Sequence, residues 1–226
     1  MSAAGSPLDP EQRLEAARSL SRVAAPTADT VAALKSLRGD ADVGVQATFG
    51  LGSALHNLAD KDPMLAAEAR TALTEQLGAA QTAGEQAAVL TALGNGGDAL
   101  TLDLIRDYVA SDAPNVRAAA AQALRRIAGG VADDMLAALC ADRASEVRLS
   151  AVDAVGERAF SPGLATALST LAVGEPDYGV RAKAVNVLAQ WSKQAPDVAS
   201  TLTIVASRDP NADLRNVANG ALGNSP

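Results

Sequence analysis

The 226-residue chain is acidic, with 19 lysines and arginines against 26 aspartates and glutamates and a formal net charge of −7. Affinity for phosphate backbones requires clustered positive charge, so this balance argues against nucleic-acid binding over the whole surface. Hydrophobic residues make up 48% of the chain but aromatic residues only 2%, so any packed core has to be built from Ala, Leu and Val.

The sequence pattern predicts helices throughout. Apolar residues recur at helical spacing, as at Val116, Ala120 and Leu124, and no segment alternates as a half-buried strand does. Several helix starts are marked by a capping side chain followed by proline. These starts are Asp9-Pro10, Asp62-Pro63, Ser161-Pro162 and Asp209-Pro210.

In chain order, we predict a leading helix over residues 10–24 and then six helix pairs. Residues 1–9 are predicted to be disordered or flexible, and residues 10–224 to form a single repeat domain. The predicted pairs are 28–38 with 43–58, 63–78 with 84–94, 98–110 with 114–127, 132–140 with 145–158, 162–172 with 178–193, and 196–207 with 211–222.

One pattern repeats in the second helices of the last four pairs. Each begins with an apolar residue and an arginine, continues in small residues, and has another apolar residue eight positions after the first. The four starts, at residues 116, 147, 180 and 214, are 31, 33 and 34 residues apart. An aspartate precedes each arginine, and we expect a structural ladder in which arginines bond these carboxylates and loop carbonyls from repeat to repeat. The expected members are Asp112/Arg117, Asp142/Arg148, Asp177/Arg181 and Asp209/Arg215.

The first two pairs depart from this pattern. Gln46 stands where the arginine would be in the first pair, and Glu85-Gln86 replace the apolar residue and arginine in the second. Atypical units are common at the ends of repeat arrays. Gly50 and Gly52 lie inside the predicted helix 43–58, where they either permit a close helix contact or kink the helix.

Helix pairs of this period, with Asp in the loop and Val-Arg opening the second helix, resemble HEAT repeats, and in particular the short bacterial type described in phycobilisome lyases. The resemblance covers about residues 28–224 and implies an all-α fold, an α–α superhelix or HEAT-like solenoid. A second stretch, Ala92-Leu93-Gly94-Asn95, is similar to a turn in the helical domain of vitellogenin-type lipid transfer proteins, and it recurs at Ala221-Leu222-Gly223-Asn224. Since that turn should lead into another helix, we expect the sequence to be part of a longer protein.

The sequence contains few of the residues that a catalytic or metal site requires. His56 is the only histidine and Cys140 the only cysteine, so the several ligands of a zinc site are missing and we predict no metal, no cofactor and no catalytic residue. Helical spacing favours a core thiol for Cys140, and a Cys–His pair with His56 requires the stack to bring the two together. His56 itself fits a polar groove position or a satisfied buried side chain.

The exposed positions of the second helices form a polar strip that we take as the candidate binding groove. Its mixed charge suits a protein or peptide better than phosphate, although a merely solvated face has the same composition. Trp191 fits either core packing or a binding anchor. The strip consists of Gln122, Arg125, Asp153, Glu157, Lys183, Asn186, Gln190, Trp191, Asn216 and Asn219.

We therefore predict a non-enzymatic protein-binding scaffold or adaptor that recognises another protein or peptide, with no nucleic acid and no membrane as partner. The alternatives are a lyase-like or a small-molecule or lipid-binding HEAT-like protein, and self-association through the ends of the stack. Without a secretory signal at its start or a cysteine pair, the chain is expected to be cytoplasmic.

Overall fold

The computed structural model describes residues 9–223, in which every regular element is a helix. The predicted flexible segment 1–9 lies outside the described residues except for Asp9. The chain divides into two compact units, unit 1 up to Thr101 and unit 2 from Leu102 onward, and each is described by itself. The single domain predicted over residues 10–224 therefore stays a prediction.

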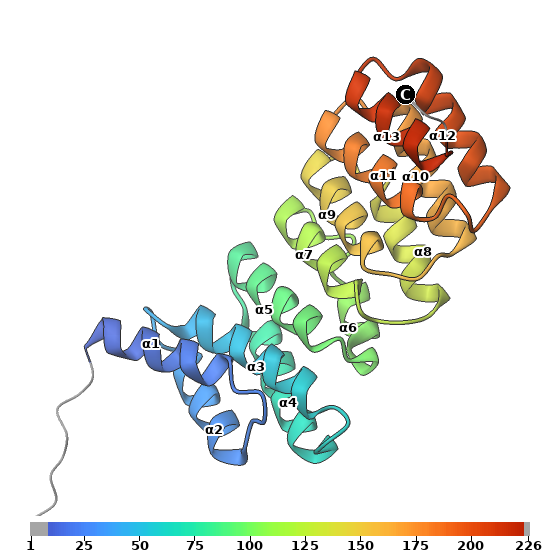
Figure 1. The fold of residues 1–226 in the computed structure, drawn as a ribbon. Helices are drawn as coiled ribbons and strands as arrows, with labels where there is room; N and C mark the ends of the chain where they lie inside the picture. Colours follow the sequence, from blue (N-terminus) through green and yellow to red (C-terminus); the bar gives the residue numbers. More distant parts are fainter. Residues whose placement is uncertain (1–8, 224–226) are drawn as a thin grey trace, which may run out of the picture. The chain divides into compact units, whose positions relative to one another are not determined.

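Unit 1 is built around one central helix. Its helices are α1 (Pro10–Ser21), α2 (Ala28–Leu37), α3 (Gly44–Leu58), α4 (Pro63–Ala79) and α5 (Ala83–Gly96), followed by the 3₁₀ turn η1 (Ala99–Thr101). Helix α3 packs against the four other α-helices, and its Leu51 and Leu55 are completely or almost completely buried (Figure 1). The helix runs on through Gly50 and Gly52, and a Cβ at either glycine would collide with a neighbouring element, which confirms the close-contact interpretation.

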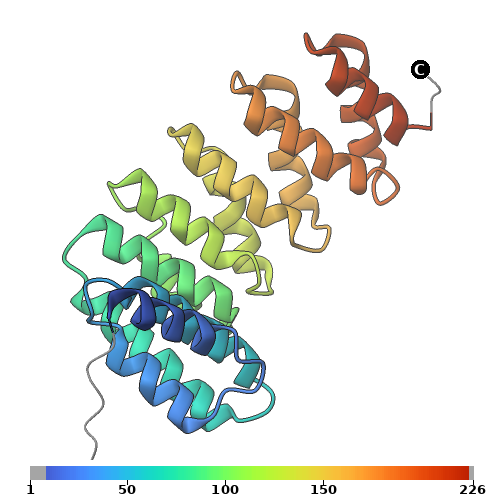
Figure 2. The ribbon, with the colours of Figure 1, turned by 60° about the vertical axis from the view of Figure 1, so that its left-hand side comes forward.

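Unit 2 is a stack of helix hairpins in two layers. It contains α6 (Leu102–Arg106), α7 (Pro114–Leu124), α8 (Gly130–Leu139), α9 (Ser145–Gly156), α10 (Pro162–Gly174), α11 (Tyr178–Gln190), α12 (Pro196–Arg208) and α13 (Ala212–Ala221). The second helices α7, α9, α11 and α13 pack in that order, and the first helices α8, α10 and α12 form the other layer (Figure 2). This arrangement is the predicted α–α superhelix of paired helices.

The helix starts follow local capping chemistry. Asp9 forms a reciprocal capping box with Gln12, and Asp62 accepts a hydrogen bond from the backbone N–H of Leu65. Ser161 stands at the N-cap of α10, directly before a proline, without a capping bond from its side chain. At Asp209-Pro210 the prediction was wrong, because Asp209 ends α12 and the side chain of Asn211 caps α13 instead.

Two further predictions need correction. The helix predicted over 98–110 is only η1 and the five-residue α6, after which residues 107–110 form turns. The stretch Ala92–Asn95 lies within α5 and is not a turn; the helix ends at Gly97, whose φ of 64° is the left-handed conformation that glycine adopts at helix ends. In the second copy, Gly223 has φ 76° and Asn224 lies outside the described residues.

Between residues 9 and 223, no helix combines the length and the apolar character that crossing a bilayer requires.

Candidate binding surface

The first residues of the four second helices of unit 2 make the same contacts in each repeat. The apolar residue that opens each pattern, such as Val116 or Val180, is buried against neighbouring helices. The arginine after it turns back toward the loop that precedes its own helix, where Nη1 donates to the carbonyl oxygen six residues earlier, at 2.7 to 2.9 Å. Those carbonyl oxygens belong to Ser111, Asp142, Glu175 and Asp209.

Two of these arginines also form bidentate salt bridges to the next repeat. Arg117 donates from Nε and Nη2 to the two carboxylate oxygens of Asp142, at 2.7 and 2.8 Å. Arg148 does the same with Glu175, at 2.7 and 2.6 Å. Such two-pronged contacts between ionised groups are the strongest hydrogen bonds that side chains make, and they fix the spacing of successive loops.

The last link between an arginine and a carboxylate of the next repeat lies at the C-terminal end of unit 2. Arg181 donates from Nε to Asp209 at 3.0 Å, and both residues are buried. Arg215 donates to the backbone carbonyls of Asp209 and Pro210, and within residues 9–223 it forms no salt bridge. The carboxylate of each link thus comes from the loop of the following repeat, 25 to 28 residues after its arginine.

The predicted ladder was wrong in two respects: in which repeat supplies the arginine for each carboxylate, and in which acidic residues take part. Asp142 and Asp209 do accept from an arginine, but from that of the preceding repeat. Asp112 offers its backbone carbonyl to an arginine, and Asp177 caps α11. Glu175 takes the place expected of Asp177 and was missed because it is a glutamate; its position six residues before the next arginine is the signal that identifies it.

Arginine contacts keep the ladder carboxylates ionised. The hydrogen bonds from Arg117 are the main cause that lowers the pKa of Asp142, and those from Arg148 likewise lower the pKa of Glu175. The same bonds raise the pKa of both arginines. The links are therefore charged at neutral pH and hold the layer of second helices in register.

Nine of the ten predicted strip residues, all except Trp191, lie on or directly after these regularly spaced helices. We call these nine residues the second-helix strip. Gln122 is half-buried and donates to the carbonyl of Ser150, which joins α7 to α9. Asp153 and Lys183 form an ion pair that joins α9 to α11. Arg125 and Asn219 are half-buried, and the other strip residues are exposed: Glu157, Lys183, Asn186, Gln190 and Asn216.

Trp191 belongs to the core. The residue is 5% exposed, and its ring packs edge-on against Phe160, with ring centroids 5.5 Å apart and the ring planes at 85°. A buried ring cannot anchor a partner without rearrangement, so we leave Trp191 out of the second-helix strip.

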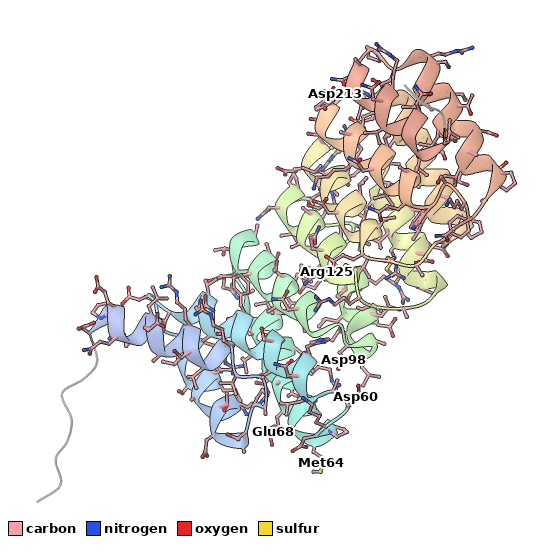
Figure 3. The ribbon with its side chains drawn as sticks, viewed as in Figure 1. Asp60, Met64, Glu68, Asp98, Arg125 and Asp213 are labelled. Carbon is pink, nitrogen blue, oxygen red and sulfur yellow. The ribbon has the colours of Figure 1, made fainter. Side chains whose placement is uncertain are left out.

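A hollow of about 360 Å³ lies at one end of the second-helix strip, where α7 and α9 end. The hollow is lined by Arg125, Arg126, Glu157 and Arg158. Arg125 directly follows α7 and is labelled in Figure 3. The remaining lining residues are Ala128, Gly129, Asp133, Ala159 and Phe160. We call it the arginine hollow.

Neither of the two reactive side chains that the sequence singled out belongs to the second-helix strip. His56 is exposed on α3 in unit 1. Cys140 is buried in unit 2, and burial raises the pKa of its thiol to about 12. No cluster of histidine, cysteine and acidic side chains suited to a metal ion occurs among the residues that the structure describes.

Comparison with known proteins assigns the repeat type. A family model of HEAT repeats matches residues 70–156 and 132–223, together more than half of the chain. No curated protein matches the chain. The predicted similarity to vitellogenin-type proteins is supported by none of these findings.

Solved structures share the fold at low sequence identity. The complex of CpcE and CpcF of phycocyanin lyase from Nostoc sp. PCC7120 is 17% identical, with a TM-score of 0.52 over 98% of this chain and 90% of that chain. An archaeal HEAT-like repeats protein from Thermococcus onnurineus NA1 is 11% identical, with a TM-score of 0.54 over 97% of each chain. The Pds5–Scc1 complex is 13% identical, with a TM-score of 0.58 over 92% of this chain and 37% of that one.

Proposed function

We propose, from the premise that this chain belongs to the HEAT-repeat family, that it is a non-enzymatic protein-binding scaffold whose unit 2 recognises a protein or peptide along the second-helix strip. Solenoids of this kind offer extended surfaces to their partners. Two of the similar folds were solved as protein complexes, CpcE with CpcF and Pds5 with Scc1, and the proposal extends that mode of action to this chain.

One observation carries the proposal. Exposed polar side chains, Lys183, Asn186, Gln190 and Asn216 among them, lie on neighbouring second helices whose spacing the arginine ladder fixes. A surface that is rigid before binding loses little conformational entropy on binding. Amides and mixed charges favour a ligand with hydrogen-bonding groups of both kinds, such as a peptide backbone with polar side chains.

The test compares two double variants of the full chain as bait in crosslinking from a lysate. Asn186→Arg with Asn216→Arg places bulk and charge on the second-helix strip. The matched control, Thr166→Arg with Thr203→Arg, makes the same change at exposed positions of the first helices α10 and α12. We expect a partner that the wild type and the control capture and the strip variant loses. Capture that is equal for all three baits, or no capture at all, contradicts the proposal.

A second candidate function has one observation in its favour. A hollow of about 290 Å³ lies beside Cys140, lined mostly by apolar side chains such as Ala137, Ala167 and Leu171. It fits the lyase-like or small-molecule alternative, in which the thiol takes part. That alternative requires Cys140→Ser to abolish ligand binding or turnover, whereas the scaffold proposal requires this variant to keep its protein partner.

Self-association through the stack ends and a cytoplasmic location stay proposals. Light scattering over a range of protein concentrations tests the first, and localisation of the tagged full-length protein tests the second.

A further inference from the structure

A hollow of about 500 Å³ lies between the C-terminal ends of the first helices α10 and α12, which pack against each other (Figure 1). We call it the α10–α12 hollow. Its wall is mostly apolar, and it includes Val173 and Ile204, which are 53% and 41% exposed. Ligand-binding hollows in proteins have volumes of roughly 300 to 1,000 Å³ and combine such apolar walls with a few polar groups.

An arginine stands in this hollow where the other repeats have a small residue. In every repeat of unit 2, the carbonyl that binds the second-helix arginine lies six positions before that arginine. The residue directly before this carbonyl is Ala110, Ala141 and Gly174 in the first three repeats and Arg208 in the last. The departure from the repeat pattern therefore adds a positive charge to the wall of the α10–α12 hollow.

The guanidinium group of Arg208 is not used by the fold. Arg208 is exposed, and its side chain forms no hydrogen bond or ion pair with any residue between 9 and 223. The two carboxylates that line the hollow are already bound, Glu175 by both prongs of Arg148 and Asp209 by Arg181. The α10–α12 hollow therefore holds one positive charge that has no counterion.

A second guanidinium group in the hollow has a donor left over. Arg181 uses Nε for the carboxylate of Asp209, at 3.0 Å, and Nη1 for the carbonyl of Glu175, at 2.7 Å. Its Nη2 makes no hydrogen bond to the described residues, whereas the same atom completes the bidentate contact in the two preceding links. Every fully buried side-chain nitrogen in the described part of unit 2 has a partner, so Nη2 of Arg181 is within reach of solvent.

The hollow beside Cys140 is the equivalent place one repeat earlier, and it lacks these features. Thr170 and Gly174 stand there at the positions that Ile204 and Arg208 occupy in the next repeat. Its ladder arginine is bound by a carboxylate through both prongs. An apolar ligand with a negative charge is therefore expected in the α10–α12 hollow and not in the hollow beside Cys140.

We propose that the α10–α12 hollow binds the C-terminal residue of a peptide or protein. The α-carboxylate of that residue is bound by Arg208 and Arg181. Its apolar side chain lies against Val173 and Ile204. Capture of a chain end through its carboxylate is a known mode of peptide recognition.

The spacing and the charge of the hollow both fit this ligand. Ile204 and Arg208 are four residues apart on α12, so their Cβ atoms are about 5–6 Å apart, which suits two groups attached to the same Cα atom. One positive charge without a counterion matches a single carboxylate. A phosphate group would bring about −1.5 to −2 charges next to the two ladder carboxylates that line the hollow, and they would repel it.

Fluorescence anisotropy of a labelled, glycine-rich peptide that ends in leucine tests the site on the full chain. The peptide is used with a free C-terminal carboxylate and as its C-terminal amide, and we expect the amide to bind about tenfold more weakly. Arg208→Gln should weaken binding of the free acid about tenfold and leave binding of the amide unchanged. The control Arg143→Gln makes the same charge change in an exposed loop outside the hollow and should leave both affinities unchanged.

A variant of the apolar wall tests the other half of the proposal. Ile204→Ser removes exposed apolar surface without emptying the core, and we expect the free acid and the amide to bind several-fold more weakly by the same factor. No detectable binding of the free acid, or equal affinities of the acid and the amide for the wild type, overturns the inference. Tighter binding of hexanoate than of the peptide overturns a chain end as the occupant.

This inference goes beyond the proposed function, because the α10–α12 hollow lies on the first helices and the second-helix strip on the second helices. If the peptide binds as expected and no partner is captured through the strip, the site for a chain end stands and the scaffold role falls. If a partner is captured through the strip but the acid and the amide bind equally, the scaffold role stands and the site for a chain end falls.

Discussion

Gly52 of α3 lies directly against the backbone of Ala92 in α5. A Cβ added to Gly52 would stand 2.1 Å from the carbonyl oxygen of Ala92 and 2.8 Å from its carbonyl carbon. Real Cβ atoms essentially never come within 3.0 Å of another heavy atom, so only glycine lets the two helices approach this closely. The packing of unit 1 depends on this contact, because α3 is the helix that all its other α-helices touch.

We expect Gly52→Ala to destabilise the protein by more than about 2 kcal/mol, because the new methyl group meets backbone that cannot move aside without shifting a whole helix. The matched control is Gly78→Ala in α4, where a Cβ would meet nothing within 4 Å. That control should be neutral or stabilising by up to about 1 kcal/mol, since alanine is the better helix former. Urea unfolding followed by circular dichroism measures both; equal stabilities would show that α3 and α5 are not in close contact.

The arginine ladder predicts a difference between two arginines at the same position of their repeats. Arg148→Ala leaves the buried carboxylate of Glu175 without its partner, and we expect a loss of about 3 kcal/mol. Arg215→Ala removes only bonds to two loop carbonyls and should cost about 1 kcal/mol. Thermal and urea unfolding of the two variants test this order, and a larger cost for Arg215→Ala would refute it.

Acid should weaken the ladder. The pKa values of Asp142 and Glu175 are lower in the folded chain than in the unfolded one, so the unfolded state takes up protons first as the pH falls. The stabilisation from these two carboxylates is complete above about pH 5 and is lost progressively as the pH falls through about 4 and below. The free energy of unfolding, measured from pH 6 to pH 3, should therefore decrease.

The control for this pH dependence is Glu175→Gln, which removes one of the two ladder carboxylates. Its free energy of unfolding should be lower at pH 6 and should change less between pH 6 and pH 3 than that of the wild type. A variant with the same slope as the wild type would show that Glu175 is not the group that titrates.

Cys140 should be almost unreactive in the folded protein. With its pKa raised to about 12 and its side chain buried, it holds almost no thiolate at pH 8, and thiolate is the species that reacts. We expect a thiol reagent to label the native chain at least about a hundredfold more slowly than the chain in urea. Labelling at equal rates would mean that the hollow beside Cys140 opens to solvent, and it would favour the small-molecule alternative.

The sequence by itself determined the helices and their pairing. Helix starts depend on residues next to one another, such as Asp9 with Pro10 or Asp62 with Pro63, and the repeating apolar-Arg pattern fixes which face of each second helix is buried. These signals are local, so the predicted helices agree with the observed ones to within a few residues at most ends. The exception, 98–110, lies at the boundary between the two units, where the regular pattern is absent.

Only the tertiary structure decided which groups meet across repeats. The carboxylate that binds Arg148 is 27 residues away, and its identity depends on how one hairpin stacks on the next, which no local pattern specifies. The same holds for Gly52 against Ala92, and for the three arginines that gather with the start of α8 around the arginine hollow. Stacking is set by the shapes of whole helices packed at high density, so these contacts appear only when the full set of side chains is placed together.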